Sequence, residues 1–155
     1  LPVVFCCENN GYAESSPAAT QHAATLEQRA AGYGVGYVAV DGNDVMAVEA
    51  AMTDVVAKVR AGSGPVIVEA STYRWHGHYE GDSQPYKPED EIDAWRERDP
   101  LEVSAARLTE SGACSRAELD QIRAEALAEV EASVERARTL PAPDPEEAYA
   151  DVYGS

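Results

Sequence analysis

Basic residues are scarce in this sequence. Its 155 residues include 12 lysines and arginines against 28 aspartates and glutamates, which gives a formal net charge of -16 at pH 7. A surface of this sign repels the phosphates of nucleic acids and of anionic lipids, because like charges oppose association. We therefore expect neither a nucleic acid nor a membrane surface among the partners of this chain.

Long apolar runs and paired cysteines are also missing. No apolar stretch approaches the ~20 residues that a helix needs to cross a bilayer, and no stretch has the charged and apolar regions of a signal peptide. The three cysteines, Cys6, Cys7 and Cys114, are odd in number and lack the CxxC or Cys/His spacing of a zinc site. This pattern argues against a disulfide framework, and we expect buried thiols in a reducing, cytoplasmic location.

What the sequence does contain, in its first half, is an alternation of strand and helix patterns. Apolar runs predict buried strands at residues 3–7, 37–40 and 66–70, and helical periodicity predicts helices over 21–31 and 45–59. We expect Gly32 to end the first helix and Asp44 to cap the second. Strands that alternate with helices in this way indicate an α/β fold built on a parallel sheet flanked by helices.

The second half is mainly helical. A short charged helix is predicted over residues 89–98, and Asp99-Pro100 has the composition of a helix start. Ser115 and Glu118 match a capping box that opens a long amphipathic helix. We accordingly divide the chain into an α/β part, residues 1–88, and a helical C-terminal extension of the same domain, residues 89–155.

The first polar loop, ENNGYA, follows the first predicted strand directly. Its asparagines supply side-chain amide oxygens, and the Asn-Gly pair lets the main chain turn sharply and present carbonyl oxygens. Neutral oxygen ligands suit Mg²⁺ or Ca²⁺ and do not suit zinc. Taken alone, an Asn-Gly pair is more often a plain turn than part of a metal site, so the residues by themselves do not establish the metal interpretation.

The second polar segment, residues 72–88, contains RWHGHYEGD and is too long for a simple connection. Its two histidines, His76 and His78, could donate hydrogen bonds or carry a proton near neutral pH. They could also be ordinary exposed histidines, or two ligands of a metal site that lacks an evident third ligand. Spacing alone does not choose among these alternatives.

Taken together, the motifs CENNGYA, VDGND, GPVIVEASTYRWHGH and RDPL occur in this order. They resemble the α subunit of the thiamine-diphosphate-dependent 2-oxoacid dehydrogenases, the decarboxylating component of pyruvate, branched-chain and acetoin dehydrogenase complexes. The resemblance extends over nearly the whole chain. It implies part of a thiamine-diphosphate-binding α/β fold and an enzyme that decarboxylates a pyruvate-like 2-oxo acid or cleaves acetoin, passing the acyl group to lipoamide.

The resemblance also implies roles for particular residues. Asn10 would bind Mg²⁺ through its side-chain oxygen and Tyr12 through its main-chain carbonyl, and together they would hold the diphosphate of the cofactor. His78 would lie over the cofactor, bind it and act catalytically by stabilising charge and moving a proton. Tyr79 stands where some relatives carry a regulatory serine, so control by phosphorylation at that position is not expected.

The family's cofactor motif opens with Gly-Asp-Gly upstream of the ENN segment, and this sequence holds only the closing half. We therefore expect the chain to be the C-terminal portion of a longer α subunit and to be inactive by itself. The resemblance implies a β subunit in an α2β2 assembly and a lipoyl-bearing acyltransferase as partners.

Two other hypotheses remain. One is a truncated, non-catalytic paralogue that only binds a partner; the retention of Asn10, Tyr12 and His78 argues against it. The other is a different thiamine-diphosphate enzyme of the transketolase type, which the TYRWHGH segment disfavours.

Overall fold

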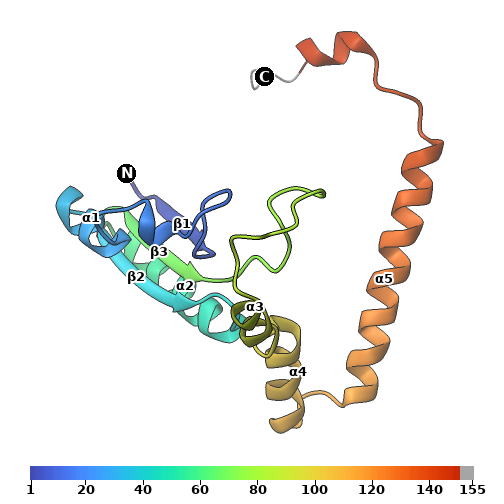
Figure 1. Ribbon diagram of the computed structural model, residues 1–155, viewed down its shortest axis with the longest axis horizontal. Coiled ribbons are helices and arrows are strands. Elements are labelled where there is room, and N and C mark those ends of the chain that lie inside the picture. Colours follow the sequence, from blue (N-terminus) through green and yellow to red (C-terminus); the bar gives the residue numbers. More distant parts are fainter. Residues whose placement is uncertain (151–155) are drawn as a thin grey trace. The chain divides into compact units, whose positions relative to one another are not determined.

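The computed structural model describes residues 1–150 (Figure 1). Residues 1–110 and the residues from 111 onward form two compact units, and each is described by itself. In chain order the elements are β1 (Val4–Asn9), η1 (Ala18–Thr20), α1 (Leu26–Tyr33), β2 (Gly36–Asp41), α2 (Val45–Arg60), β3 (Val66–Ser71), α3 (Glu89–Arg96), α4 (Pro100–Glu110), α5 (Arg116–Thr139) and η2 (Pro145–Tyr149).

The three strands of the first unit form a parallel sheet in the order β1-β3-β2. Their registers are aligned, so that Asn9, Ser71 and Asp41 end the strands at the same edge of the sheet. Helices α1 and α2 flank the sheet (Figure 1). This arrangement confirms the predicted α/β fold and gathers the segments that follow β1 and β3 at one end of the sheet.

The core of this unit lies between the sheet and helix α2. Val55 and Val59 of α2 are buried against Val66 and Val68 of β3, the central strand. Each such valine stabilises the fold by about 1.5–3 kcal/mol relative to an exposed side chain. Because β3 has a neighbour on both sides and α2 over one face, it is the best-buried strand.

Local hydrogen bonds fix the ends of the helices. Helix α1 begins later than predicted because Thr25 and Gln28 form a capping box, in which each side chain accepts a hydrogen bond from the other residue's main-chain N–H. It ends at Gly34, whose φ of 68° is left-handed, and not at Gly32 as predicted. Asp44 caps α2 as predicted, since its carboxylate accepts from Ala47 N over 3.2 Å.

Strand β1 is less buried than predicted. It is an edge strand, and Phe5 on it is 54% exposed because the face of the sheet opposite α2 is incompletely covered at this edge. Cys6 is exposed, while Cys7 and Cys114 are half-buried. The expectation of buried thiols is therefore wrong for Cys6.

Helices α3 and α4 belong to the first unit. Arg107 of α4 pairs with Asp44 at the start of α2, and Asn43 Nδ2 donates to the carbonyl oxygen of Arg98 over 2.8 Å. The compact units consequently divide after Glu110, whereas the sequence analysis divided the chain at residue 88.

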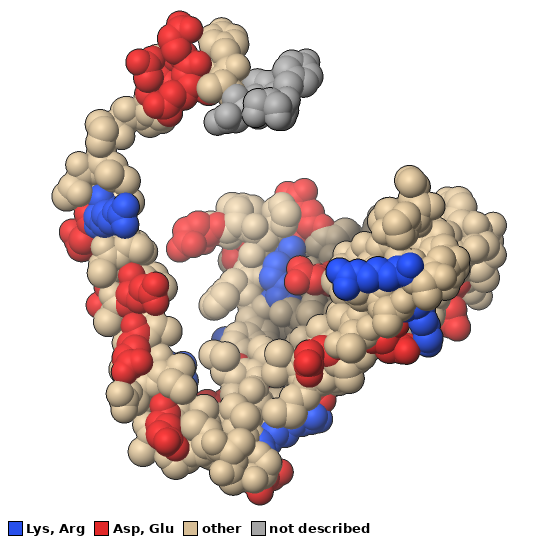
Figure 2. Space-filling model, turned by 180° about the vertical axis from the view of Figure 1, so that it is seen from behind, with Lys and Arg blue, Asp and Glu red and all other residues tan. Residues whose placement is uncertain are grey.

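The second unit contains α5, which begins at the predicted capping box of Ser115 and Glu118. The apolar side chains Ile122, Val130 and Val134 on this helix are at least 44% exposed. Acidic side chains recur along its length (Figure 2). The end of the predicted extension, residues 151–155, lies outside the described residues. A search of residues 1–150 finds no helix with the length and apolar character needed to span a membrane.

Candidate functional site

The turn that follows β1 is built by two successive asparagines. Asn9 Oδ1 accepts a hydrogen bond from Gly11 N over 3.0 Å, and Asn10 Oδ1 accepts one from Tyr12 N over 2.9 Å. Gly11 has a φ of 76°, a left-handed conformation that glycine adopts without steric cost. The sequence Asn-Asn-Gly therefore specifies a tight turn at the carboxyl end of an outer strand, where ligands of parallel sheets commonly bind.

This turn forms one wall of an open hollow of about 700 Å³. Its other walls come from the segment that enters α1 and from the side of β3. The titratable and amide side chains among its lining residues are those of Cys7, Glu8, Asn9, Asn10, Tyr12, His22, Gln28, Arg29 and Glu69. The turn itself offers amide and carbonyl oxygens, and neutral oxygens of this kind suit a hard divalent cation.

The side chain of Tyr12 is anchored away from the turn, whereas its main chain forms part of the turn. Its hydroxyl donates to Glu91 Oε2 over 2.5 Å, and its ring lies 6.1 Å from the ring of Tyr73 in an edge-on arrangement. Burial, followed by the hydrogen bond to Glu91, raises the pKa of this hydroxyl above its usual range. The phenol therefore stays protonated at neutral pH and continues to donate.

A buried lysine, Lys87, holds the main chain of the second polar segment, residues 72–88. Lys87 Nζ donates to the carbonyl oxygens of Arg74 and His76 and lies 4.9 Å from the centre of the Tyr73 ring and 5.4 Å from that of Tyr12. Burial, and next the charge of Arg74, lowers the pKa of Lys87. This ammonium thus ties the main chain around the histidines to the aromatic cluster beneath the first loop.

His78 lies on an exposed part of this segment. Its main-chain N–H donates to Asp82 Oδ2 over 2.8 Å, and its Nδ1 lies 3.3 Å from Arg74 Nη1. Because a guanidinium only donates, a hydrogen bond across this contact requires Nδ1 to accept, which puts the imidazole proton on Nε2. In this tautomer the imidazole can donate from Nε2.

Asp82 organises the turn around His78. Its carboxylate accepts from Tyr86 Oη over 2.6 Å and from the main chain of His78 and Gln84. The hydrogen bond from Tyr86, and then those from the main chain, lower the pKa of Asp82 to about 2. Gly77 allows this approach, because a Cβ at that position would lie 2.4 Å from the Asp82 Cβ.

The two loops meet, but the predicted site residues do not all line one hollow. Arg74 Nη2 donates to the carbonyl oxygen of Glu14 over 2.9 Å, which joins the loop after β3 to the loop after β1. Asn10 and Tyr12 line the larger hollow, whereas His78 lines a separate one of about 360 Å³. Within residues 1–150, no group of three or more His, Cys, Asp or Glu side chains is arranged to hold a metal ion, so the two-histidine metal hypothesis finds no third ligand there.

Sequence reasoning missed Glu69, a charged residue of the larger hollow. Glu69 stands in the middle of β3, between buried Val68 and Ala70, and receives hydrogen bonds from Asn9 and Tyr37. The available signal was a single carboxylate within the apolar run VIVEA. A charged side chain in a central strand requires partners, and these could have been sought on the neighbouring strands.

Comparison with known proteins gives consistent matches. The family described as "Dehydrogenase E1 component" matches residues 1–146. The α subunit of acetoin:2,6-dichlorophenolindophenol oxidoreductase from Cupriavidus necator is 41% identical over 157 residues, covering 100% of this chain and 47% of the relative. The pyruvate dehydrogenase E1 component subunit α from Rhizobium meliloti is 41% identical over 154 residues, covering 98% and 44%.

A third relative extends the range of substrates named. The 3-methyl-2-oxobutanoate dehydrogenase subunit α from Mycobacterium tuberculosis is 39% identical over 127 residues, covering 81% of this chain and 35% of the relative. The chain therefore spans less than half the length of these curated relatives.

Proposed function

The chain belongs to the dehydrogenase E1 component family, and from this premise we propose that it forms part of the α subunit of a thiamine-diphosphate-dependent dehydrogenase. The complete enzyme would decarboxylate a 2-oxo acid, or cleave acetoin, and pass the acyl group to lipoamide. The observation that supports this proposal is the Asn-Asn-Gly turn, whose residues Asn10 and Tyr12 line a hollow at the carboxyl end of a parallel sheet.

The residues at this turn fit a Mg²⁺ ion bound to a diphosphate. The Asn10 amide oxygen has two lone pairs, and the hydrogen bond from Tyr12 N uses one of them. The Tyr12 carbonyl is a second neutral oxygen ligand on the same turn. Mg²⁺ is commonly bound by a few protein oxygens together with phosphate oxygens and water, which matches a site that supplies only part of the coordination shell.

When bound, thiamine diphosphate would supply the electron sink that stabilises the electron pair left behind on loss of carbon dioxide. In this proposal Asn10 and Tyr12 bind the metal and so fix the diphosphate end of the cofactor. His78 donates a hydrogen bond from Nε2 and stabilises charge near the reacting groups. Arg74 holds the imidazole in this tautomer through Nδ1.

Asn10 and His78 line separate hollows, and in this proposal further residues complete the site between them. A catalytic role for His78 requires it to face a cofactor that is only partly held by this chain, so the remaining walls must come from residues outside it. Partners that could supply such walls are the rest of the α subunit and a β subunit in an α2β2 assembly. A lipoyl-bearing acyltransferase is the expected acceptor component.

The experiment that tests this function uses the full-length α subunit assembled with its β subunit. Pyruvate, branched-chain 2-oxo acids and acetoin are supplied in turn, and acylation of lipoamide is followed with and without Mg²⁺ and thiamine diphosphate. We expect acylation with at least one substrate, dependent on both additions. His78→Ala should reduce turnover strongly, by about 10²–10⁴-fold if it acts as an acid or base, while the melting temperature of the assembly stays unchanged.

The reverse pattern would contradict the proposal. If the assembled protein acylates lipoamide with none of these substrates but still binds its β subunit, the partner-binding paralogue becomes the better account. If turnover is normal in His78→Ala, the role given to His78 is wrong.

A further inference from the structure

Glu69 occupies an unusual position for a charged residue. It lies on the central strand of the sheet, on the face opposite helix α2, and its chain neighbours Val68 and Ala70 are buried. Glu69 itself is half-buried and lines the open hollow, and a carboxylate that has lost part of its contact with water is more stable when it is hydrogen-bonded. The hydrogen bonds of Glu69 therefore indicate which parts of the structure it holds in place.

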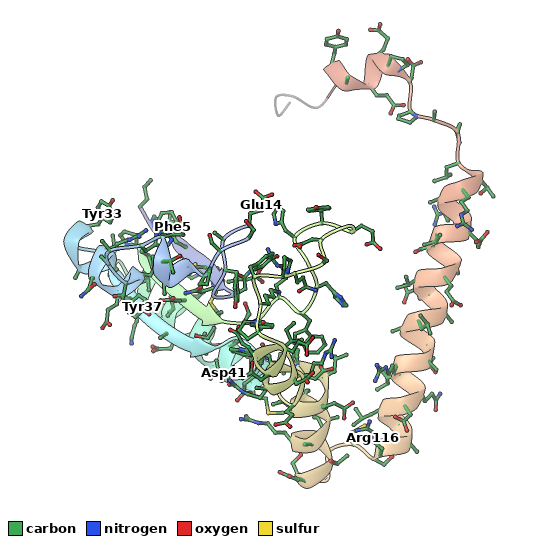
Figure 3. The ribbon with its side chains drawn as sticks, viewed as in Figure 1. Phe5, Glu14, Tyr33, Tyr37, Asp41 and Arg116 are labelled. Atoms are coloured by element: carbon green, nitrogen blue, oxygen red, sulfur yellow. The ribbon has the colours of Figure 1, made fainter. Side chains whose placement is uncertain are left out.

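Both oxygens of Glu69 accept a hydrogen bond from an outer strand. Oε1 accepts from Asn9 Nδ2 on β1, and Oε2 accepts from Tyr37 Oη on β2, each over 2.5 Å. In the register of the sheet Glu69 is aligned with Cys7 and Ala39, so its side chain reaches diagonally to both partners on the same face. Figure 3 shows the labelled Tyr37 at its place on β2. The carboxylate thus bridges all three strands.

Tyr37 is a permanent donor in this bridge. The hydrogen bond to Glu69, and then burial, raises the pKa of the Tyr37 hydroxyl to about 12. The phenol is therefore protonated throughout the physiological range and keeps Glu69 Oε2 occupied.

Asn9 transmits the position of Glu69 to the turn. Its amide group is held at both ends, since Nδ2 donates to Glu69 and Oδ1 accepts from Gly11 N. Its main-chain oxygen also accepts from Thr72 N over 3.0 Å. Asn10 lies between Asn9 and Gly11, so the contacts of Asn9 help to fix the main chain at Asn10, whose own amide oxygen accepts from Tyr12 N.

We propose that Glu69 is a positioning residue that acts through Asn9 to hold the turn carrying Asn10 and Tyr12 in the geometry that a divalent cation and its diphosphate require. The inference rests on the proposed function, because it assigns the turn to a metal–diphosphate ligand. It adds two residues, Glu69 and Tyr37, that touch neither ligand in this account. Partners that orient metal ligands typically change metal affinity by about 10–100-fold when they are removed.

The test measures Mg²⁺ binding in the full-length α subunit assembled with its β subunit. Mg²⁺ is titrated at saturating thiamine diphosphate, and heat release gives the apparent Kd without reliance on turnover. Glu69→Ala should raise this Kd by about 10–100-fold. At saturating Mg²⁺ the kcat should recover to near the wild-type value, because the ligands themselves remain.

Conservative and matched variants separate positioning from other roles. Glu69→Gln keeps a carbonyl oxygen for Asn9 and an amide that can donate to Tyr37, so its Kd should stay within about threefold of wild type. Asn9→Ala should reproduce the effect of Glu69→Ala, and the double variant should add little, because the two residues act in one chain of contacts. Glu49→Ala, at an exposed position on α2, is the control and should leave the Kd unchanged.

Four results would overturn the inference. A wild-type Kd in Glu69→Ala, alongside a weakened Asn10→Ala, would remove Glu69 from the site and leave the proposed function standing. Unchanged Kd values in both variants would contradict the metal assignment of the proposed function itself. A loss in Glu69→Gln as large as that in Glu69→Ala would indicate that the negative charge acts directly on the ligand. If Glu69→Ala does not assemble, Asn9→Ala and Tyr37→Phe carry the test, and wild-type Kd values in both would overturn the inference.

Discussion

The guanidinium of Arg74 donates from Nη2 to the main-chain carbonyl oxygen of Glu14 over 2.9 Å. Figure 3 shows the labelled Glu14 on the loop after β1, at the side that faces the segment after β3. The same guanidinium contacts Tyr86 Oη at 3.0 Å and His78 Nδ1 at 3.3 Å. One arginine therefore links the loop that carries Asn10 to the loop that carries His78.

Replacing this arginine should loosen both loops together. In Arg74→Met the hydrogen bonds to Glu14 and Tyr86 are lost, at a cost of about 1 kcal/mol or more for each. We expect faster amide hydrogen exchange in residues 11–17 and in residues 76–82, with unchanged exchange in β3. Faster exchange in only one of the two loops would show that Arg74 does not couple them. Arg60→Met is a suitable control, because Arg60 is exposed at the end of α2.

The buried ammonium of Lys87 should contribute more to stability than a surface lysine. Lys87→Met keeps the length of the side chain but leaves the carbonyl oxygens of Arg74 and His76 without their donor. We expect the free energy of unfolding to fall by about 1–3 kcal/mol in denaturant titrations. Lys58→Met, which removes an exposed pair with Asp54, should cost about 0.5 kcal/mol or less. Equal effects of the two substitutions would contradict the role given to Lys87.

The carboxylate of Asp82 should make the loop around His78 sensitive to acid. Its pKa is lowered to about 2 in the folded chain from an ordinary value of 3.8. A group with a depressed pKa stabilises the fold fully above its unfolded pKa, and that contribution is lost as the pH falls from 3.8 towards 2. The stability difference between wild type and Asp82→Asn should therefore shrink across this window. A difference that stays constant over the window would contradict the assignment.

Gly77 should resist substitution, whereas Gly32 should accept it. A Cβ at position 77 would meet Asp82 at 2.4 Å, so Gly77→Ala must displace the turn that holds His78. Gly32 lies within helix α1 with open space around its Cβ direction, so Gly32→Ala should stabilise the fold by about 0.5–1 kcal/mol. Thermal unfolding should show opposite shifts for the two variants. A stabilising Gly77→Ala would mean that the contact with Asp82 is absent in solution.

Features fixed by nearby residues were predictable from the sequence. The caps at Asp44 and at Ser115 with Glu118 depend on side chains within three residues of the helix start, and both occur as predicted. The end of α1 was misassigned because two glycines, Gly32 and Gly34, lie within reach of it. The choice between them depends on which residue adopts the left-handed conformation.

Features that depend on strand order were not predictable. The bridge from Asn9 through Glu69 to Tyr37 exists only because β3 lies between β1 and β2, an order that the linear sequence does not reveal. The exposure of Phe5 has the same origin, since an apolar run reads as buried whether its strand is central or at an edge. The motif ENNGYA indicated the turn, but the hydrogen bond from Asn9 to Glu69 on the neighbouring strand could be found only in the folded sheet.

The most direct test of the account is the affinity of Asn10→Ala for Mg²⁺ and thiamine diphosphate, measured by calorimetry in the full-length α subunit assembled with its β subunit. The account predicts a Kd raised by about tenfold or more, with recovery in Asn10→Asp, which restores an oxygen ligand. Thermal unfolding without ligands should be similar in both variants. An Asn10→Ala assembly that binds Mg²⁺ and the cofactor with wild-type affinity would contradict the assignment of this turn to the metal–diphosphate site.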